Sequence, residues 1–110
     1  MKQGEIWMAG LNPVEGSEQR GIRPVIIISG NAMNNNLGSS IVCPLTSKVK
    51  NYAGCLVLAK DDRNGLEQDS EVIIFQIRTI SHGRLIRKIG NITVKQLEQI
   101  KKGLDEIMTY

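Results

Sequence analysis

Short apolar runs alternate with polar connections along most of this chain. The runs are rich in β-branched residues and bounded by Gly, Asn, Asp or Pro, a pattern typical of β-strands. Five or six strands are therefore predicted, at residues 4–11, 22–29, 39–45, 54–59, within 70–80 and, shorter and basic, at 84–89. The run at 22–29 is almost wholly apolar, which indicates a strand buried on both faces.

The polar connections predict where the chain turns. Residues 12–21 form a ten-residue loop with one proline, two glycines and two carboxylates. Residues 30–38 have room for a short helical turn, although their three consecutive asparagines are poor helix formers. Residues 61–65 (DDRNG) predict a turn, with a strong Asn-Gly signal at Asn64 and Gly65.

The pattern changes to a helical period at the C-terminal end. Thr93 is a good N-cap, and Gln96 three residues later completes a capping box. Apolar residues then recur at helical spacing, at Val94, Leu97, Ile100, Leu104, Ile107 and Met108. Gly103 is expected to cost this helix about 1 kcal/mol relative to alanine. The stripe predicts a helix that covers one side of the sheet.

Together these elements predict a mainly β fold with α: a small, partly open antiparallel barrel with a C-terminal helix. The 110 residues suffice for a single domain, residues 1–110. No apolar stretch approaches the roughly 18 residues that span a membrane. The N-terminus lacks the apolar segment of a leader peptide, so we expect a cytoplasmic location.

Cysteine usage and charge narrow the function classes. Cys43 and Cys55 lie in apolar segments, and with one histidine in the chain they do not form a zinc ligand set. We expect buried, reduced thiols. The formal net charge is +3, and residues 93–110 contain three lysines and three acids, so the excess falls in residues 1–92. A mildly basic body suits a polyanionic partner.

Polar residues at strand ends are the candidates for chemistry. The common protease, P-loop, CxxC and serine-hydrolase motifs are absent, and the single histidine, His82, lies in a turn-like segment where solvation is the simplest interpretation. Arg23, in front of Pro24, and Thr46 can meet at one rim if their strands pair. A guanidinium grips two phosphoryl oxygens and a hydroxyl adds a further hydrogen bond. Taken alone, each side chain is more simply interpreted as a solvated loop residue.

Specific motifs change that balance. The first 25 residues carry fixed residue types at fixed spacing: Gly4-Glu5-Ile6-Trp7, Pro13, Gly16-Ser17-Glu18-Gln19, Gly21 and Arg23-Pro24-Val25. This pattern resembles the start of the MazF/PemK family of toxin endoribonucleases. Residues 76–80 (QIRTI) resemble a second block of the family, with Phe75 where an acid often precedes the glutamine.

The resemblance implies an SH3-like barrel of the MazF, Kid and CcdB type that forms a homodimer. It also implies that Arg23 and Thr46 are the catalytic pair. We add Glu18 as a candidate base or orienting partner of Arg23, because arginine stays protonated and is a poor base. Residues expected to contact RNA are Gln19, Ser47, Gln76, Arg78 and Arg84.

The resulting hypothesis is metal-independent cleavage of single-stranded RNA without a cofactor. The substrate's 2′-hydroxyl attacks the adjacent phosphate and leaves 2′,3′-cyclic phosphate and 5′-hydroxyl ends, which requires stabilisation of a dianionic intermediate. The resemblance also implies a MazE-like antitoxin, with an acidic, partly disordered tail that folds along the toxin and blocks the site.

Two other interpretations stay open. CcdB-like toxins share the barrel and bind DNA gyrase through C-terminal residues of the Trp-Gly-Ile type, whereas this chain ends Ile-Met-Thr-Tyr. A non-catalytic RNA-binding barrel is the third interpretation, which the GSEQ and Arg-Pro motifs oppose. Substitution of Arg23 by alanine distinguishes them, since it removes cleavage but not gyrase binding.

Overall fold

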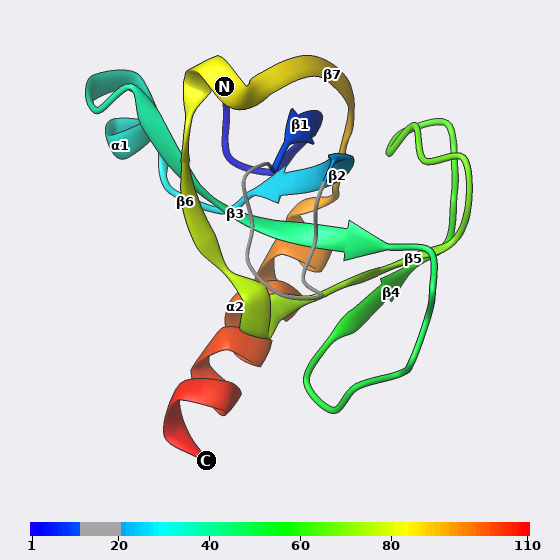
Figure 1. Cartoon of the computed structure of the whole chain (residues 1–110). Helices are drawn as coiled ribbons and strands as arrows, with labels where there is room; N and C mark the ends of the chain where they lie inside the picture. Colours follow the sequence, from blue (N-terminus) through cyan, green and yellow to red (C-terminus); the bar gives the residue numbers. More distant parts are fainter. Residues whose placement is uncertain (12–20) are drawn as a thin grey trace.

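A curved antiparallel sheet forms the body of the protein (Figure 1). The computed structural model describes residues 1–11 and 21–110. The elements are β1 (Glu5–Gly10), β2 (Ile22–Ile27), α1 (Asn31–Asn36), β3 (Ser39–Thr46), β4 (Leu56–Leu58), β5 (Ser70–Val72), the 3₁₀ turn η1 (Ile74–Gln76), β6 (Arg78–Ser81), the 3₁₀ turn η2 (His82–Arg84), β7 (Leu85–Asn91) and α2 (Val94–Thr109). This arrangement confirms the predicted mainly β fold with a C-terminal helix.

The seven-stranded sheet is ordered β4–β5–β3–β2–β1–β7, and β6 pairs with β3 off this path. All the pairings among the described strands are antiparallel. β3 is the central strand because it pairs with β2, β5 and β6. The sheet stays open, since no pairing joins β4 to β7 in the described residues.

Two apolar clusters cover the two faces of the sheet. The larger contains Ile26, Cys43 and Leu45 from the strands and Ile100 from α2. The smaller contains Ala9, Val25, Ile27, Val42, Ile80 and Leu85, with Trp7 packed against it. Successive residues of the second half of β2 therefore enter opposite clusters, so burial on both faces is confirmed for this half, whereas Ile22 at the start of the strand is 63% exposed.

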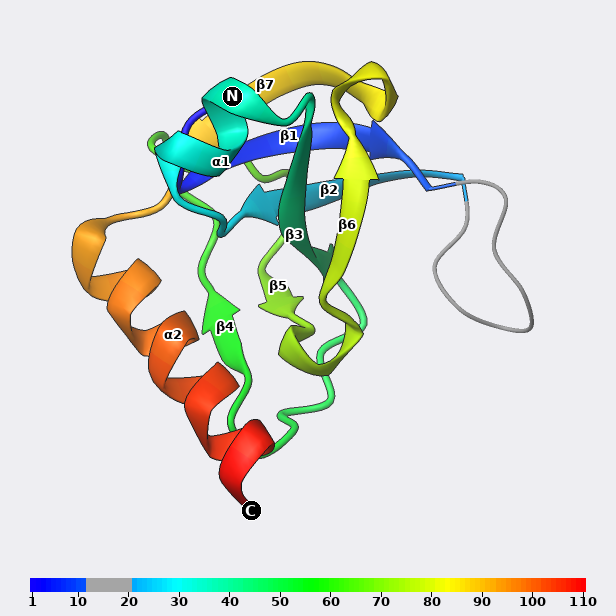
Figure 2. The ribbon, with the colours of Figure 1, turned by 90° about the vertical axis from the view of Figure 1, so that its left-hand side faces the viewer.

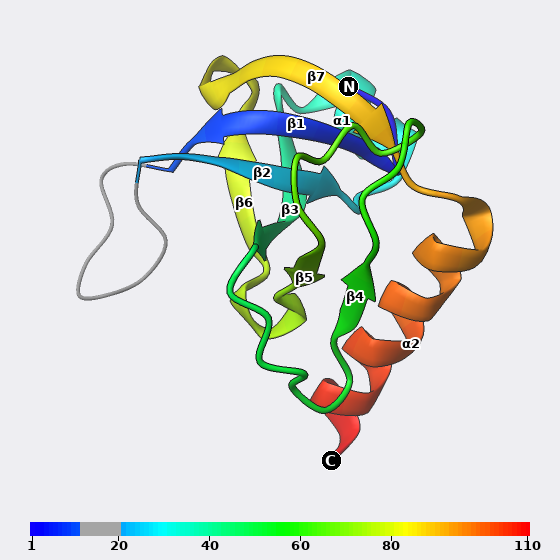
Figure 3. The same ribbon diagram turned by 90° about the vertical axis from the view of Figure 1, so that its right-hand side faces the viewer.

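The C-terminal helix α2 lies alongside β4, as Figures 2 and 3 show from opposite sides. Thr93 accepts a hydrogen bond from the Gln96 backbone N–H, and the Gln96 side chain accepts one from the Thr93 backbone N–H, so the predicted capping box is confirmed. Ile100 is fully buried. The two ends of the predicted apolar stripe do not pack against the sheet: Val94 is 74% exposed and Met108 is 84% exposed.

The segment at residues 70–80, expected as one strand, is instead divided. β5 and β6 both pair with β3, but in different registers. In the pairing of β3 with β5, Leu45 lies opposite Val72. If this register continued along β3, Phe75 would lie opposite Val42. In the pairing of β3 with β6, however, Arg78 lies opposite Val42. The turn η1 takes up the difference of three residues. The other expected strands are present with ends shifted by one or two residues.

Two of the polar connections contain the local structure that the sequence allows. Residues 31–36 form the helix α1 despite their asparagines, and Asn34 is buried there with hydrogen bonds to Ser29. Asn64 and Gly65 lie in a turn, as the sequence predicts: residues 62–64 are a turn, and the Gly65 backbone N–H donates to the carbonyl of Asp61 at 3.1 Å. They lie within the long connection between β4 and β5, where the Asn64 side chain bonds the backbone of Ala59, Asp61 and Leu66. No helix in the described residues is long and apolar enough to cross a membrane.

Candidate active site

Arg23 and Thr46 lie at matching ends of neighbouring strands. In the β2–β3 pairing, the last residues opposite one another are Val25 and Pro44. Arg23 is two residues beyond Val25, and Thr46 is two residues beyond Pro44, within β2 and β3 respectively. Because side chains alternate along a strand, both point to the face that carries the smaller apolar cluster. Both are half-buried, at the polar end of that face.

The hydroxyl of Thr46 has a fixed backbone donor. The N–H of Lys48 donates to Thr46 Oγ1 at 3.1 Å. This bond occupies an acceptor position of the oxygen and leaves the hydroxyl proton available. Thr46 can therefore donate a hydrogen bond to an anionic oxygen in front of it, which is what a phosphate site requires.

Arg78 approaches the same face from β6. It lies opposite Val42, a member of the smaller cluster, and side chains of opposed residues project to the same side. Arg78 is half-buried. Two guanidinium groups and one hydroxyl thus share one face of the sheet, and this arrangement favours a polyanionic ligand.

Gln76 lies two residues earlier, in η1. Its side-chain oxygen Oε1 is buried and has no hydrogen-bond partner in the described part of the chain. The preceding Phe75 is 48% exposed and makes an edge-to-face contact with Tyr52, with the ring centroids 5.1 Å apart. The departure from the family pattern at Phe75 therefore places an aromatic ring beside the loop that follows β3.

The remaining sequence candidates are dispersed. Ser47 is exposed directly after Thr46, and Arg84 is half-buried in η2 at the start of β7. Glu18 and Gln19, the candidate base and one candidate RNA contact, lie outside the described residues.

A cavity of about 450 Å³ adjoins this site. Its lining includes Arg23 and Ser47, together with Met8, Pro24, Leu45, Leu66, Glu67 and Arg87. By strand alternation Met8, Pro24 and Leu45 belong to the opposite face of the sheet from Thr46. The cavity therefore reaches the site at Arg23, and Thr46 is not among the described residues that line it.

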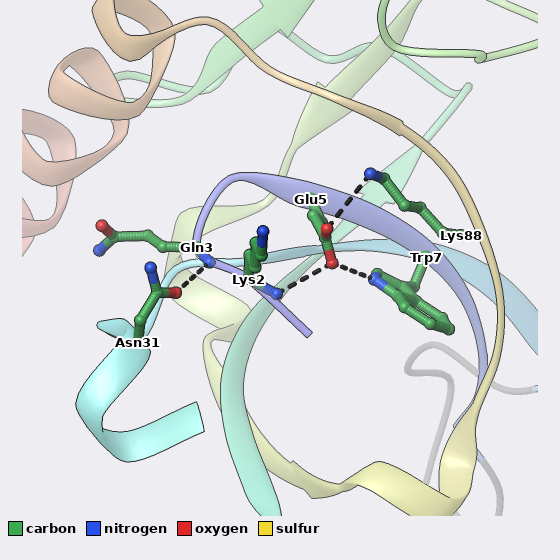
Figure 4. Close-up of polar contacts among 6 residues, drawn as sticks. All are labelled: Lys2, Gln3, Glu5, Trp7, Asn31 and Lys88. Carbon is green, nitrogen blue, oxygen red and sulfur yellow. Dashed lines mark hydrogen bonds and ion pairs between the residues drawn. The ribbon is translucent and has the colours of Figure 1, made fainter. Parts of the chain in front are cut away.

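Glu5 has a structural role in the motif Gly4-Glu5-Ile6-Trp7 at the start of the chain. Its carboxylate accepts hydrogen bonds from the backbone N–H of Lys2 and from Trp7 Nε1, both at 2.9 Å, and pairs with Lys88 of β7 at 3.2 Å (Figure 4). Burial raises the pKa of Glu5, but the hydrogen bonds from Lys2, Trp7 and Lys88 and the charge of Lys88 outweigh it, so the pKa lies below its ordinary value. The contacts of Glu5 thus connect the N-terminus to β7, and none of them involves Arg23 or Thr46.

His82 is held by hydrogen bonds, unlike the solvated turn residue expected. Its Nε2 lies 2.8 Å from Ser40 Oγ, and Ser40 donates its hydroxyl proton to Asn34 Oδ1 at 2.7 Å. Because Ser40 has one hydroxyl proton, His82 Nε2 must carry the proton of the bond between them. His82 therefore cannot act as a base toward Ser40 in this arrangement.

The cysteines are free thiols. Burial, with a smaller contribution from Cys55, raises the pKa of Cys43 to about 12. The pKa of Cys55, which is half-buried, is also raised by burial. Both thiols therefore stay protonated near neutral pH, consistent with the expected packing role.

Sequence reasoning missed one residue near the site. Glu71 of β5 lies directly opposite Thr46 and is fully buried. It accepts hydrogen bonds from three consecutive backbone N–H groups, those of Lys50, Asn51 and Tyr52. The sequence contains one indication of this role, namely that an acidic residue lies inside a strand that is predicted to be buried.

Comparisons with known proteins identify the family of the chain. A family model described as the PemK-like, MazF-like toxin of type II toxin–antitoxin systems matches residues 2–108. Endoribonuclease MazF of Staphylococcus saprophyticus is 33% identical over 106 residues, which cover 96% of this chain and 88% of that protein.

Solved structures show the same fold. MazF of Deinococcus radiodurans superimposes with a TM-score of 0.85, at 22% identity, over 100% of this chain and 97% of that one. A MazE–MazF structure from the same organism gives a TM-score of 0.80, at 23% identity, over 98% and 95%. From the family match over residues 2–108, the chain belongs to the PemK-like, MazF-like toxins of type II toxin–antitoxin systems.

Proposed function

We propose that this chain is a toxin endoribonuclease that cleaves single-stranded RNA, including mRNA, in the bacterial cytoplasm and so inhibits translation and growth. The observation that carries the proposal is the position of Arg23 and Thr46 at matching ends of β2 and β3, on one face of the sheet. The name of the Staphylococcus saprophyticus relative supports the same activity.

The proposed reaction needs no protein nucleophile. The 2′-hydroxyl of the RNA attacks the adjacent phosphorus, the bond to the 5′-oxygen of the next nucleotide breaks, and that oxygen leaves as a hydroxyl after taking up a proton. Arg23 neutralises the developing dianionic phosphorane, and the Thr46 hydroxyl donates a hydrogen bond to one of its oxygens. Arg23 can also supply the proton, whereas Glu18 is the candidate that accepts the proton of the 2′-hydroxyl.

The other candidate residues would hold the RNA chain. Arg78 lies on the same face as the catalytic pair, and Ser47 follows Thr46 directly. With Gln19, Gln76 and Arg84 they would contact phosphates and unstacked bases. Only four aromatic residues are present in the chain, so hydrogen bonds would contribute more to recognition than base stacking.

We further propose a homodimer and a cognate antitoxin. The structure from Deinococcus radiodurans contains MazF with MazE. In this chain the net charge of +3 suits an acidic antitoxin tail. Such a tail would compete with RNA for the face that carries Arg23 and Arg78, and its folding on binding would give tight but reversible inhibition.

The test is cleavage of a long single-stranded RNA in excess EDTA, with analysis of the new ends. The wild type is expected to cut at defined sites and leave 2′,3′-cyclic phosphate and 5′-hydroxyl ends. Arg23→Ala and Thr46→Ala should each lose about 10²- to 10³-fold in kcat, the usual effect of removing one oxyanion donor. Arg63→Ala, which removes an exposed arginine of the connection between β4 and β5, beside Asn91 of β7, is the matched control.

A folded wild-type protein that leaves diverse RNAs intact would disprove the proposal. Inhibition of DNA gyrase by that protein would then support the CcdB-like alternative. RNA binding without cleavage would support the non-catalytic barrel.

A further inference from the structure

Glu71 occupies an unusual place for a carboxylate. It lies in the middle of β5, opposite Thr46 on one side and Val57 of β4 on the other. Its exposed fraction is 0%. In the described residues its carboxylate makes no ion pair, since the ion pair found there joins Lys88 and Glu5. A buried charge without a counterion requires strong hydrogen bonds.

Three backbone donors provide them. The N–H groups of Lys50 and Asn51 donate to Oε1 at 2.7 and 3.1 Å, and that of Tyr52 donates to Oε2 at 2.8 Å. All three belong to the loop that follows β3. The carboxylate therefore binds the far end of this loop to the strand that lies opposite Thr46.

This loop, residues 47–52, is held at both ends. At its start the Lys48 N–H donates to Thr46 Oγ1. At its end, besides the bonds to Glu71, the Tyr52 ring packs edge-to-face on Phe75. Between them Asn51 adopts a φ of 56°, a left-handed conformation that asparagine tolerates better than most residues. Such a conformation persists where the surroundings impose it.

We infer that Glu71 is a positioning residue for the proposed ribonuclease reaction. Its carboxylate accepts hydrogen bonds from the backbone N–H groups of Lys50, Asn51 and Tyr52 and so fixes the backbone conformation of the loop. This conformation also fixes the position of the Lys48 N–H. That donor in turn fixes the oxygen of Thr46 and the direction in which its hydroxyl proton points. Glu71 thus acts on the phosphate through Thr46, without touching the RNA. This inference rests on the proposed function.

The decisive variant is Glu71→Gln. It keeps the shape of the side chain but replaces one acceptor oxygen by an amide that repels a backbone N–H. We expect kcat to fall about 10- to 100-fold, because displacement of a catalytic group by 1 Å has effects of this size. KM should stay within about twofold, since uniform binding of the RNA is untouched. Glu71→Asp, one methylene shorter but still charged, should lie between the wild type and Glu71→Gln.

Two controls separate positioning from a general loss of stability. Thr93→Ala removes the N-cap of α2, far from Thr46, and lowers the melting temperature without contact to the site. Asp69→Asn removes a charge from the connection between β4 and β5, where Asp69 accepts a hydrogen bond from the N–H of Lys60. Both controls should keep wild-type kcat when assayed well below their melting temperatures.

Amide hydrogen exchange gives a second readout that needs no RNA, and its first part uses the wild type alone. The amides of residues 50–52 should exchange at least about tenfold more slowly than exposed amides of the loop, if the bonds to Glu71 persist in solution. In Glu71→Gln this protection, and that of Lys48, should be lost while the strands stay protected.

Three results would overturn the inference: wild-type kcat in folded Glu71→Gln, an equal loss of kcat in Thr93→Ala, or unprotected amides at residues 50–52 of the wild type. If Glu71→Gln does not fold, the kinetics of Glu71→Asp and the wild-type exchange decide. Absence of RNA cleavage by the wild type would refute the proposed function, and the exchange data would still report on the hydrogen bonds of Glu71.

Discussion

The hydroxyl of Thr46 is the residue-scale feature on which the proposed chemistry depends most. Because its oxygen accepts the Lys48 N–H, the proton is free to be donated. Thr46→Ser keeps this arrangement and should retain activity within about tenfold, whereas Thr46→Val, of nearly equal volume, should lose about 10²-fold or more in kcat. Single-turnover cleavage of a short fluorogenic RNA measures both. Equal activity of the Ser and Val variants would contradict the role of the hydroxyl.

Glu5 gives a prediction for pH. Its pKa in the folded protein is below its ordinary value of 4.5, so ionised Glu5 stabilises the fold at all pH values above that value. The contribution is lost as the pH falls below 4.5 and through the lowered pKa. At pH 7, Glu5→Gln should lose about 1–3 kcal/mol in free energy of unfolding, because buried donors lose a charged acceptor. Urea denaturation at pH 7 and at pH 3 should show a smaller difference between wild type and variant at pH 3, and an unchanged difference would refute this assignment.

At the scale of elements, helix propensity and tertiary packing predict opposite effects on stability for Gly103→Ala in α2. Propensity alone predicts that Gly103→Ala stabilises the helix by about 1 kcal/mol. A Cβ at Gly103, however, would lie 2.3 Å from the carbonyl oxygen of Gly54 and 2.3 Å from Ile74 Cδ1. We therefore expect net destabilisation of about 1–3 kcal/mol, measured as a lower melting temperature. Lys102→Ala, on an exposed position of the same helix, is the control and should change little.

At the scale of the whole molecule, the loop between β4 and β5 connects the two edges of the open sheet. The N–H of Asn91 in β7 donates to the carbonyl of Arg63 at 2.9 Å. A Cβ at the neighbouring Gly90 would lie 2.4 Å from that carbonyl oxygen. Gly90→Ala should therefore separate loop from strand and lower the free energy of unfolding by about 1–3 kcal/mol.

The control for that prediction is Gly10→Ala in β1, where the substitution adds a Cβ that would meet no atom of the described residues within 4 Å. Chemical denaturation of both variants compares them directly. Equal stability of Gly90→Ala and Gly10→Ala would show that the contact between loop and β7 contributes little to the fold.

Much of this molecule follows from local sequence signals. The strands at β1, β2 and β3 are short apolar runs between turn residues, and the capping box at Thr93 starts α2. These signals act within a few residues, so they appear without knowledge of the rest of the chain. The motifs at residues 4–25 and 76–80 similarly predicted the family, and Arg23 and Thr46 lie at matching strand ends.

Tertiary structure decided what depends on pairing between distant segments. The register shift along β3 divides residues 70–80 into two strands, and the amides that bind Glu71 lie some twenty residues earlier in the chain. Ser40 and His82 are 42 residues apart, and the backbone of Gly54 makes Gly103 necessary. Local propensity cannot predict such contacts, because they form only after the strands have paired in a particular register. The sequence thus determined which elements form and to which family they belong, and the fold determined which groups surround Thr46.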